Sequence, residues 1–290
     1  MAKIGITGAN GELGRRTAQY VEQSSADTEL VLLTRTPDAL TESSRNTEIR
    51  QADFDQPGPL VEAFQGIDVL LLISTDAVGR RAQQHGNAIS AAVTAGVKRI
   101  VYTSATNPHA RHAAGLSALM GDHAETENAL KEAGISWTVL RNGLYLDAFA
   151  PLWAQAAATG QLVTNNGAGQ HAPVAREDCA AAAAAVLTTD GHESAVYDIL
   201  GPQLIDDAAI AAILNKGTEH PVQVVHVSDQ AYADGLNAAG LPAEIAGPIV
   251  GFGASIREGL LAAPIGDTEK LIGRAPISAE QFLAEAASRS

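Results

Sequence analysis

Residues 5–19, GITGANGELGRRTAQ, decide the fold predicted for this chain. An apolar run precedes three glycines spaced three residues apart, Gly8, Gly11 and Gly14, and a helix-like segment follows them. Strand, glycine turn and helix in this order are typical of a dinucleotide-binding βαβ unit. Gly8 allows the tight turn, Gly11 leaves room for a pyrophosphate, and Gly14 lets the helix pack closely on the strand.

The helix that begins near Gly11 directs free N–H groups and a partial positive charge at the same turn. Both features favour a bound phosphate. We therefore predict that the turn binds a dinucleotide, and the alternative is a glycine-bearing turn without a ligand. The residues predicted to surround the diphosphate are Gly8, Ala9, Asn10, Gly11, Glu12 and Leu13.

Short apolar runs alternate with helix-like segments along the first half of the chain. The runs are apolar on successive residues, which indicates strands covered on both faces. Strict alternation of strand and helix predicts right-handed βαβ units, and hence an α/β fold with a Rossmann-type, doubly wound parallel sheet. The strands are predicted at residues 3–7, 30–34, 48–54, 69–74, 99–104 and 137–141, and the helices at 12–23, 59–65, 79–95 and 119–133.

The composition changes after about residue 146, where alanine-rich stretches begin. Residues 179–187, CAAAAAAVL, predict a helix whose small side chains let it lie close to a sheet. Further strands are predicted at residues 196–201 and 222–227. We predict a dinucleotide-binding domain over residues 1–146 and a smaller C-terminal α/β substrate lobe over 147–290, interwoven with the first because no clean linker separates them.

Composition limits the possible partners. The chain has 290 residues, 46% of them apolar, a formal net charge of −14 and a pI of about 4.9. The negative charge makes nucleic acid a poor partner. The lone Cys179 excludes an internal disulfide and a multi-cysteine zinc site, and no metal site is expected. No apolar run approaches the roughly 20 residues that span a bilayer, and no secretory signal is visible, so we expect a cytoplasmic protein without a membrane partner.

The end of the second predicted strand decides between NADP and NAD. An acidic residue at this point binds the ribose 2′-hydroxyl of NAD, whereas an arginine accommodates the 2′-phosphate of NADP. Here the strand ends in LTRTP, with Arg35 in place and no acid before Asp38. NADP is therefore favoured, with NAD as a second cofactor, and the alternative is that Arg35 is a solvated surface residue.

Other polar residues follow the strands at the edge where ligands bind in open α/β sheets. Asp53, after the third strand, is expected beside the adenine, or else in a plain turn. Ser74, Thr75 and Asp76 follow the fourth strand, and Ser104 ends the fifth.

The helix after the fifth strand lacks the Tyr-x-x-x-Lys pair of ordinary short-chain dehydrogenases, which argues against that kind of alcohol dehydrogenase. Leu119 and His123 stand in its place. His123 is expected to be solvated or packed, with a proton relay as the alternative. Glu125 and Glu127 are expected on a polar helix face, and residues 107–117 are expected to form a loop over the substrate.

Several stretches carry a resemblance to a known family. They are ITGANGELG, LTRTP, RQADFD, GRRAQQHGNAI, DHAETENALKEAGI, LRNGLY and TEKLIGRAP, and they cover nearly the whole chain in order. The chain resembles the NmrA-like, atypical short-chain dehydrogenases/reductases, and within them the bacterial type 2 NAD(P)H:quinone oxidoreductases. The resemblance implies NADPH-dependent, two-electron reduction of a quinone by hydride transfer without flavin. An electron-poor quinone needs little polarisation, which is consistent with the missing Tyr–Lys pair.

The resemblance also implies roles for individual residues. Arg35 is expected to meet the 2′-phosphate, Asn142 to orient the quinone oxygen, and Tyr145 to be a candidate donor. The alternative for Asn142 is a backbone cap at the strand end. The other positions expected around the cofactor are residues 8–13, Ser74, Thr75 and Asp76 on the ribose side, Arg141 and Gly143 at the nicotinamide end, and Arg176 closing the pocket.

Two other functions are compatible with these residues. Some NmrA-like proteins bind NADP and regulate a partner without turnover, and the glycine turn would serve such a sensor equally well. A reductase or epimerase of another small carbonyl compound is the third possibility. A homodimer is a further expectation.

Overall fold

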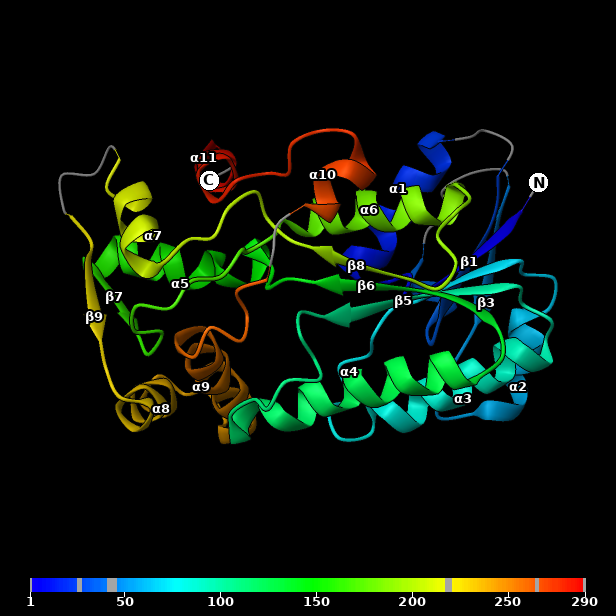
Figure 1. The fold of residues 1–290 in the computed structure, drawn as a ribbon, viewed down its shortest axis with the longest axis horizontal. Coiled ribbons are helices and arrows are strands. Elements are labelled where there is room, and N and C mark those ends of the chain that lie inside the picture. Colours follow the sequence, from blue (N-terminus) through cyan, green and yellow to red (C-terminus); the bar gives the residue numbers. More distant parts are fainter. Residues whose placement is uncertain (1, 25–27, 41–45, 217–220, 264–265, 289–290) are drawn as a thin grey trace.

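The computed structural model describes residues 2–24, 28–40, 46–216, 221–263 and 266–288. Its centre is a seven-stranded sheet in the order β3-β2-β1-β4-β5-β6-β8, in which every neighbouring pair is parallel (Figure 1). This order confirms the predicted doubly wound α/β fold. The strands are β1 (Lys3–Thr7), β2 (Glu29–Thr34), β3 (Thr47–Gln51), β4 (Val69–Leu72), β5 (Arg99–Ala105), β6 (Ser136–Asn142) and β8 (Ala195–Ile199).

Helices cover both faces of the sheet, which explains the continuous apolar runs of the central strands. One face carries α1 (Glu12–Ser24), α6 (Arg176–Thr188) and α10 (Asp267–Ile272), above the sheet in Figure 1. The other face carries α2 (Pro57–Phe64), α3 (Arg81–Thr94) and α4 (Ala114–Glu132). Four of the six alanines of α6 (Ala180, Ala182, Ala183 and Ala184) are buried and belong to the core between α1 and the sheet, as predicted. The edge strand β3 is half-exposed and shorter than predicted.

The second lobe lies beyond the carboxyl ends of β5 and β6, on the left of Figure 1. There a small sheet pairs β7 and β9 in parallel, and β7 was not predicted. The elements of this lobe are α5 (Leu146–Thr159), β7 (Gln161–Thr164), α7 (Asp207–Leu214), β9 (Gln223–His226), α8 (Asp229–Ala238), α9 (Ala243–Arg257) and α11 (Ala279–Ser288). The first half of the chain also contains the 3₁₀ turn η1 (Pro37–Ala39).

The two halves of the chain share the large sheet. Strand β8, α6 and α10 come from the second half, yet they complete the sheet and one of its helical layers. The large sheet therefore continues past residue 146 of the chain, which agrees with two interwoven halves. The division into domains at 1–146 and 147–290 stays a prediction.

The segment after β5 joins the sheet to the second lobe. Buried His112 contacts Ser255 Oγ of α9 through Nδ1 (3.1 Å) and Asn107 O through Nε2 (2.9 Å). The side-chain amide of Asn107 donates to Leu260 O (3.1 Å). The predicted loop over residues 107–117 is correct only in part, because α4 begins at Ala114.

Candidate active site

The glycine turn between β1 and α1 has the geometry of a bare main-chain cradle. Gly8 adopts a φ of +62°, which an L side chain rarely accepts. A Cβ at Gly11 would lie 3.2 Å from Gly8 O, and one at Gly14 would lie 2.5 Å from the same oxygen. The missing side chains at Gly11 and Gly14 are therefore explained by the close approach of the first turn of α1 to the loop.

Asn10 ties this cradle to the end of β2. Its Nδ2 donates to Thr36 Oγ1 (2.8 Å) and Thr36 O (3.2 Å), while its Oδ1 is buried without a hydrogen-bond partner among the described residues. The N–H of the neighbouring Ala9 donates to Leu33 O (3.2 Å). An unpartnered buried oxygen in this position is consistent with a ligand hydroxyl or amide in the cradle.

The side chains of Arg35 and Asp53 differ in the contacts that they make with the rest of the protein. Arg35 is exposed at the carboxyl end of β2, and within the described ranges its guanidinium forms no ion pair. Asp53, in contrast, accepts hydrogen bonds from the N–H of Asp55 (3.0 Å) and from Gln56 Nε2 (2.9 Å). Within the described part of the chain the Arg35 guanidinium is thus without a carboxylate partner, whereas the carboxylate of Asp53 stabilises the turn before α2.

The segment after β4 is fixed by the side chains behind it. The N–H of Ser74 donates to Thr103 Oγ1 (2.9 Å), and the N–H of Thr75 donates to His85 Nε2 (3.2 Å). Burial, together with the nearby Arg81, lowers the pKa of His85 to about 3, so this ring is neutral and can accept. The peptides of the predicted ribose side are thereby fixed, and Asp76 follows them as an exposed side chain.

Asn142 and Tyr145 form a polar pair at the end of β6. Asn142 is buried, and its Nδ2 donates to the Tyr145 hydroxyl (3.0 Å). Its Oδ1 has no hydrogen-bond partner among the described residues, so the side chain does not act as a backbone cap there. Burial raises the pKa of Tyr145, which keeps its hydroxyl protonated. Close beside the pair, a Cβ at Gly143 would lie 3.0 Å from Ala172 O.

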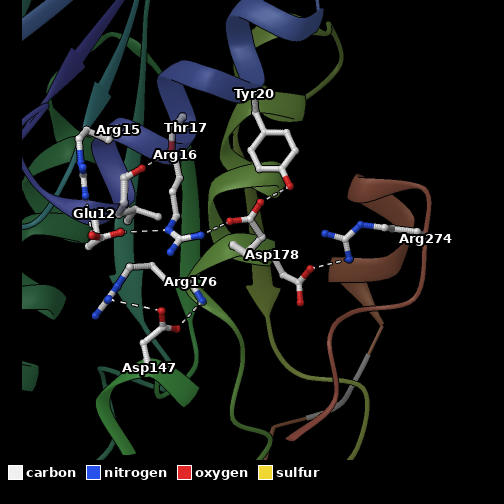
Figure 2. A network of polar contacts seen from close by, with 11 residues as sticks. Glu12, Arg15, Arg16, Thr17, Tyr20, Asp147, Arg176, Asp178 and Arg274 are labelled. Atoms are coloured by element: carbon white, nitrogen blue, oxygen red, sulfur yellow. Dashed lines mark hydrogen bonds and ion pairs between the residues drawn. The ribbon is translucent and has the colours of Figure 1, made fainter. Parts of the chain in front are cut away.

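Arg176 lies across the ring of Tyr145. The centre of its guanidinium is 4.8 Å from the ring centroid, and Nη1 is 3.6 Å from Asp147 Oδ1. The other carboxylate oxygen of Asp147 accepts the N–H of Arg176 (2.9 Å), so Asp147 also holds the first turn of α6. Figure 2 shows Arg176 between Asp147 and the Glu12 end of α1. Arg176 is therefore placed between the cradle and the Asn142–Tyr145 pair.

A polar network fastens α1 to α6 (Figure 2). Glu12 pairs with Arg15 and Arg16, and Arg16 also pairs with Glu177 of α6. The Tyr20 hydroxyl donates to Glu177 Oε1 (2.5 Å). A hydrogen bond from Arg16 lowers the pKa of Glu12, so its carboxylate is ionised and neutralised by arginines. Because the Glu12 carboxylate is paired with these arginines, the group that Glu12 can offer to a diphosphate is its main-chain N–H.

Glu127 was wrongly predicted to lie on a polar helix face. Its side chain is fully buried, and it accepts hydrogen bonds from Ser104 Oγ (2.7 Å) and from Arg141 Nε and Nη2 (2.9 and 2.8 Å). Burial alone would raise the pKa of Glu127, but hydrogen bonds from Arg141, Ser104 and His109 outweigh it and lower the pKa to about 2. Arg141, predicted at the nicotinamide end, therefore has its guanidinium bound to Glu127.

A helical pattern in the sequence could have revealed this buried carboxylate. Glu127 shares the stripe of Leu116, Met120, His123 and Leu130, all buried in α4. Spacings of three and four residues place these side chains on one face. A charged residue on such a face is rarely buried without a partner, so the pattern indicates that Glu127 has one, and the structure identifies it as Arg141.

His123 is packed and not solvated. Its Nδ1 contacts the Tyr102 hydroxyl (2.8 Å) and its Nε2 contacts Arg81 Nη1 (3.1 Å). Burial and the positive charge of Arg81 lower the pKa of His123 to about 3. Since an arginine can only donate, His123 is a neutral acceptor behind the sheet edge.

The described residues contain no cluster of three or more histidine, cysteine or acidic side chains that could hold a metal ion. Nor does any helix in the described ranges have the length and apolarity to cross a membrane.

Comparison with known proteins identifies the family. The NAD(P)H-binding family matches residues 8–190, which include the cradle and the polar pair. The chain belongs to this NAD(P)H-binding family. It is 35% identical to quinone oxidoreductase 2 of Escherichia coli (strain K12) over 93% of both chains. These matches confirm the expected resemblance to NmrA-like reductases and bacterial quinone oxidoreductases.

Two solved structures share the whole fold. The NADPH-dependent quinone oxidoreductase of Escherichia coli in complex with NADPH superposes with a TM-score of 0.93, at 33% identity over 98% of this chain and 99% of that one. The Citrobacter sp. triphenylmethane reductase in complex with NADP(H) gives a TM-score of 0.91, at 30% identity over 98% and 100%.

Proposed function

We propose that this chain is an NADPH-dependent reductase that transfers a hydride to a quinone without flavin. The observation that carries the proposal is one sheet edge that holds both a bare phosphate cradle and a buried amide–phenol pair, Asn142 and Tyr145. The names of the E. coli relatives, at 33–35% identity over nearly the whole chain, support the same activity. The bound cofactor would supply the hydride, and the chain would supply binding and orientation.

The residues of the cradle fit a dinucleotide. Gly8, Gly11 and Gly14 leave the main chain bare, and the N-terminus of α1 directs its N–H groups at the same point. Arg35 would bind the 2′-phosphate that distinguishes NADPH from NADH, because its guanidinium is exposed and without an ion pair in the described part of the chain. Arg176 would close the nicotinamide side.

The substrate end would hold a carbonyl oxygen. Asn142 has a second N–H beyond the one donated to Tyr145, and the raised pKa of Tyr145 keeps its hydroxyl a donor. Two donors next to each other suit an oxygen that becomes more negative as the quinone is reduced. An electron-poor quinone needs little polarisation of its carbonyl before it accepts the hydride.

The test is oxidation of NADPH and of NADH with a series of benzoquinones and naphthoquinones, in the parent and in Arg35→Ala. We expect KM for NADPH to rise roughly 10- to 100-fold in Arg35→Ala, as for a lost charge-assisted hydrogen bond, with NADH unaffected. Lys98→Ala is the matched control, because Lys98 is an exposed cation at the amino end of β5 that pairs with Asp68 at 2.7 Å.

Other outcomes would favour the other functions. An equal rise in KM for NADPH and for NADH in Arg35→Ala would contradict the proposed binding of the 2′-phosphate by Arg35. NADPH binding without oxidation by any quinone would indicate a sensor, and turnover restricted to other carbonyl compounds would indicate a different reductase. A cytoplasmic location and a homodimer remain predictions of the sequence.

A further inference from the structure

One accessible imidazole lies at the carboxyl edge of β5. The side chain of His109 is 40% exposed, and its Nε2 is 3.0 Å from Glu127 Oε2. The neighbouring His112 and His123 are buried, and both of their ring nitrogens are engaged by protein atoms. In His109, by contrast, Nε2 contacts Glu127, and the second ring nitrogen, Nδ1, faces away from this partner.

Glu127 fixes the orientation of this ring. The carboxylate is fully buried, and it accepts hydrogen bonds from Ser104 Oγ and from Nε and Nη2 of Arg141 at 2.7–2.9 Å. An ionised carboxylate can only accept, so His109 must donate its Nε2–H to it. This leaves Nδ1 to receive or deliver a proton, in the way that a carboxylate orients the histidine of an acid–base pair.

The segment that carries the oriented ring starts at the proposed substrate end. In the β5–β6 register Ser104 pairs with Arg141 and Ala105 pairs with Asn142. Successive residues of a strand point to opposite faces, so Arg141 reaches Glu127 on the α4 side while Asn142 reaches Tyr145 on the other. The two clusters therefore flank one strand end, and the segment that carries His109 starts there, with the N–H of Thr106 bound to Asn142 O (3.2 Å).

Hydride transfer to a quinone leaves an oxygen anion that must take up a proton. We propose that His109, oriented by Glu127, donates this proton to the reduced quinone, an inference that rests on the proposed function. The Nδ1–H bond of the imidazolium breaks, and an O–H bond forms on the hydroquinone. The hydride brings both electrons, and the neutral ring regains its proton from solvent through its exposed side. His109 would then be the catalytic acid and Glu127 a positioning residue.

Charged groups of three elements surround this pair. Lys131 of α4 is 3.6 Å from Glu127 Oε2, and Arg141 of β6 binds both carboxylate oxygens. Asp198 of β8 pairs with Arg141 in the strand register, and its negative charge stabilises the guanidinium. Lys131, Arg141 and Asp198 lie on a helix and on strands of the sheet. His109, in contrast, lies on the loop that follows β5.

The experiment compares the parent with His109→Gln, using NADPH and one simple benzoquinone. We expect kcat to fall roughly 100-fold, the size of a lost general acid. The decline of the parent kcat at alkaline pH and its solvent deuterium isotope effect should both be lost. His192→Gln is the matched control, because His192 is bound to Thr189 and Tyr197 away from this edge. Calorimetric NADPH binding checks that each variant is folded.

A readout without turnover tests the role of Glu127. Imidazole ¹⁵N shifts of the free protein should place the proton of neutral His109 on Nε2, and Glu127→Gln should give a mixture of tautomers. Unchanged kcat, pH profile and isotope effect in His109→Gln would overturn the inference, as would a tautomer with the proton on Nδ1 in the parent. Absence of quinone turnover in the parent would instead refute the proposed function.

Discussion

A Cβ atom at Gly14 would lie 2.5 Å from Gly8 O and 3.0 Å from Ala9 Cα. Main-chain atoms cannot turn aside as a flexible side chain can, so α1 or the cradle must shift. We expect Gly14→Ala to lower the free energy of unfolding by about 2 kcal/mol, the usual cost of overpacking, and to weaken NADPH binding at least ~10-fold. Urea denaturation and calorimetry measure the two effects.

Gly121→Ala is the control for this substitution. Gly121 lies inside α4, and a Cβ there would meet nothing within 4 Å. Alanine in an open helical position should leave stability unchanged or raise it by up to about 1 kcal/mol. If Gly14→Ala behaved like Gly121→Ala, the close approach of α1 to the loop would not matter for the cradle.

At the scale of residues, the sequence predicts what depends on local spacing. The glycines and Arg35 follow from their distance to one strand end: Gly8 has a positive φ and Arg35 is exposed, while their roles toward a cofactor stay predictions. The Glu127–Arg141 pair joins residues 14 positions apart on a helix and a strand. Such a contact depends on how α4 packs on the sheet, and no short motif encodes it.

At the scale of elements, α10 protects the outer edge of the sheet. Thr268 Oγ1 accepts the N–H of Leu200 (2.7 Å) and donates to Leu200 O (2.8 Å), and Asp267 accepts the N–H of Asp198 (2.9 Å). Side chains of α10 thus satisfy main-chain groups at and just beyond the end of β8 that another strand would otherwise pair.

We expect Thr268→Val to lower the free energy of unfolding by roughly 2 kcal/mol, because valine leaves buried main-chain groups of Leu200 without partners. Thr159→Val is the matched control, since the hydroxyl of Thr159 is exposed at the end of α5. The measurement is chemical denaturation of both variants. If Thr268→Val lowered the free energy of unfolding no more than Thr159→Val does, water would be replacing the Thr268 hydroxyl at Leu200.

The start of α4 and the strand β7, which the sequence did not predict, lack local signals. The helix α4 starts after Ala113, which provides no side-chain cap, so the sequence carries no start signal there. Strand β7 is four residues long and pairs with β9, about 60 residues later in the chain. The central strands were predicted because burial on both faces leaves an uninterrupted apolar run, which a short pair at the surface does not require.

At the scale of the whole molecule, neutral histidines are buried in both halves. His85 and His123 lie between α3, α4 and the sheet, and His171 packs against Phe149 in the second lobe, with ring centroids 5.5 Å apart. Burial lowers the pKa of His85 and His123 to about 3 and that of His171 to about 4. In the unfolded chain the same rings have a pKa of about 6.5.

The free energy of unfolding should therefore fall as the pH falls from about 7 towards 4. Below about pH 6.5 the unfolded chain binds protons that the folded chain cannot, so each buried histidine costs roughly 2 kcal/mol between pH 7 and pH 5. His171→Phe should remove one such contribution, because phenylalanine keeps the contact with Phe149 and cannot be protonated. His226→Gln, at an exposed histidine of β9, is the control. Urea denaturation at pH 7 and pH 5 measures the difference, and an equal loss in His171→Phe and the parent would exclude His171 as a source of acid sensitivity.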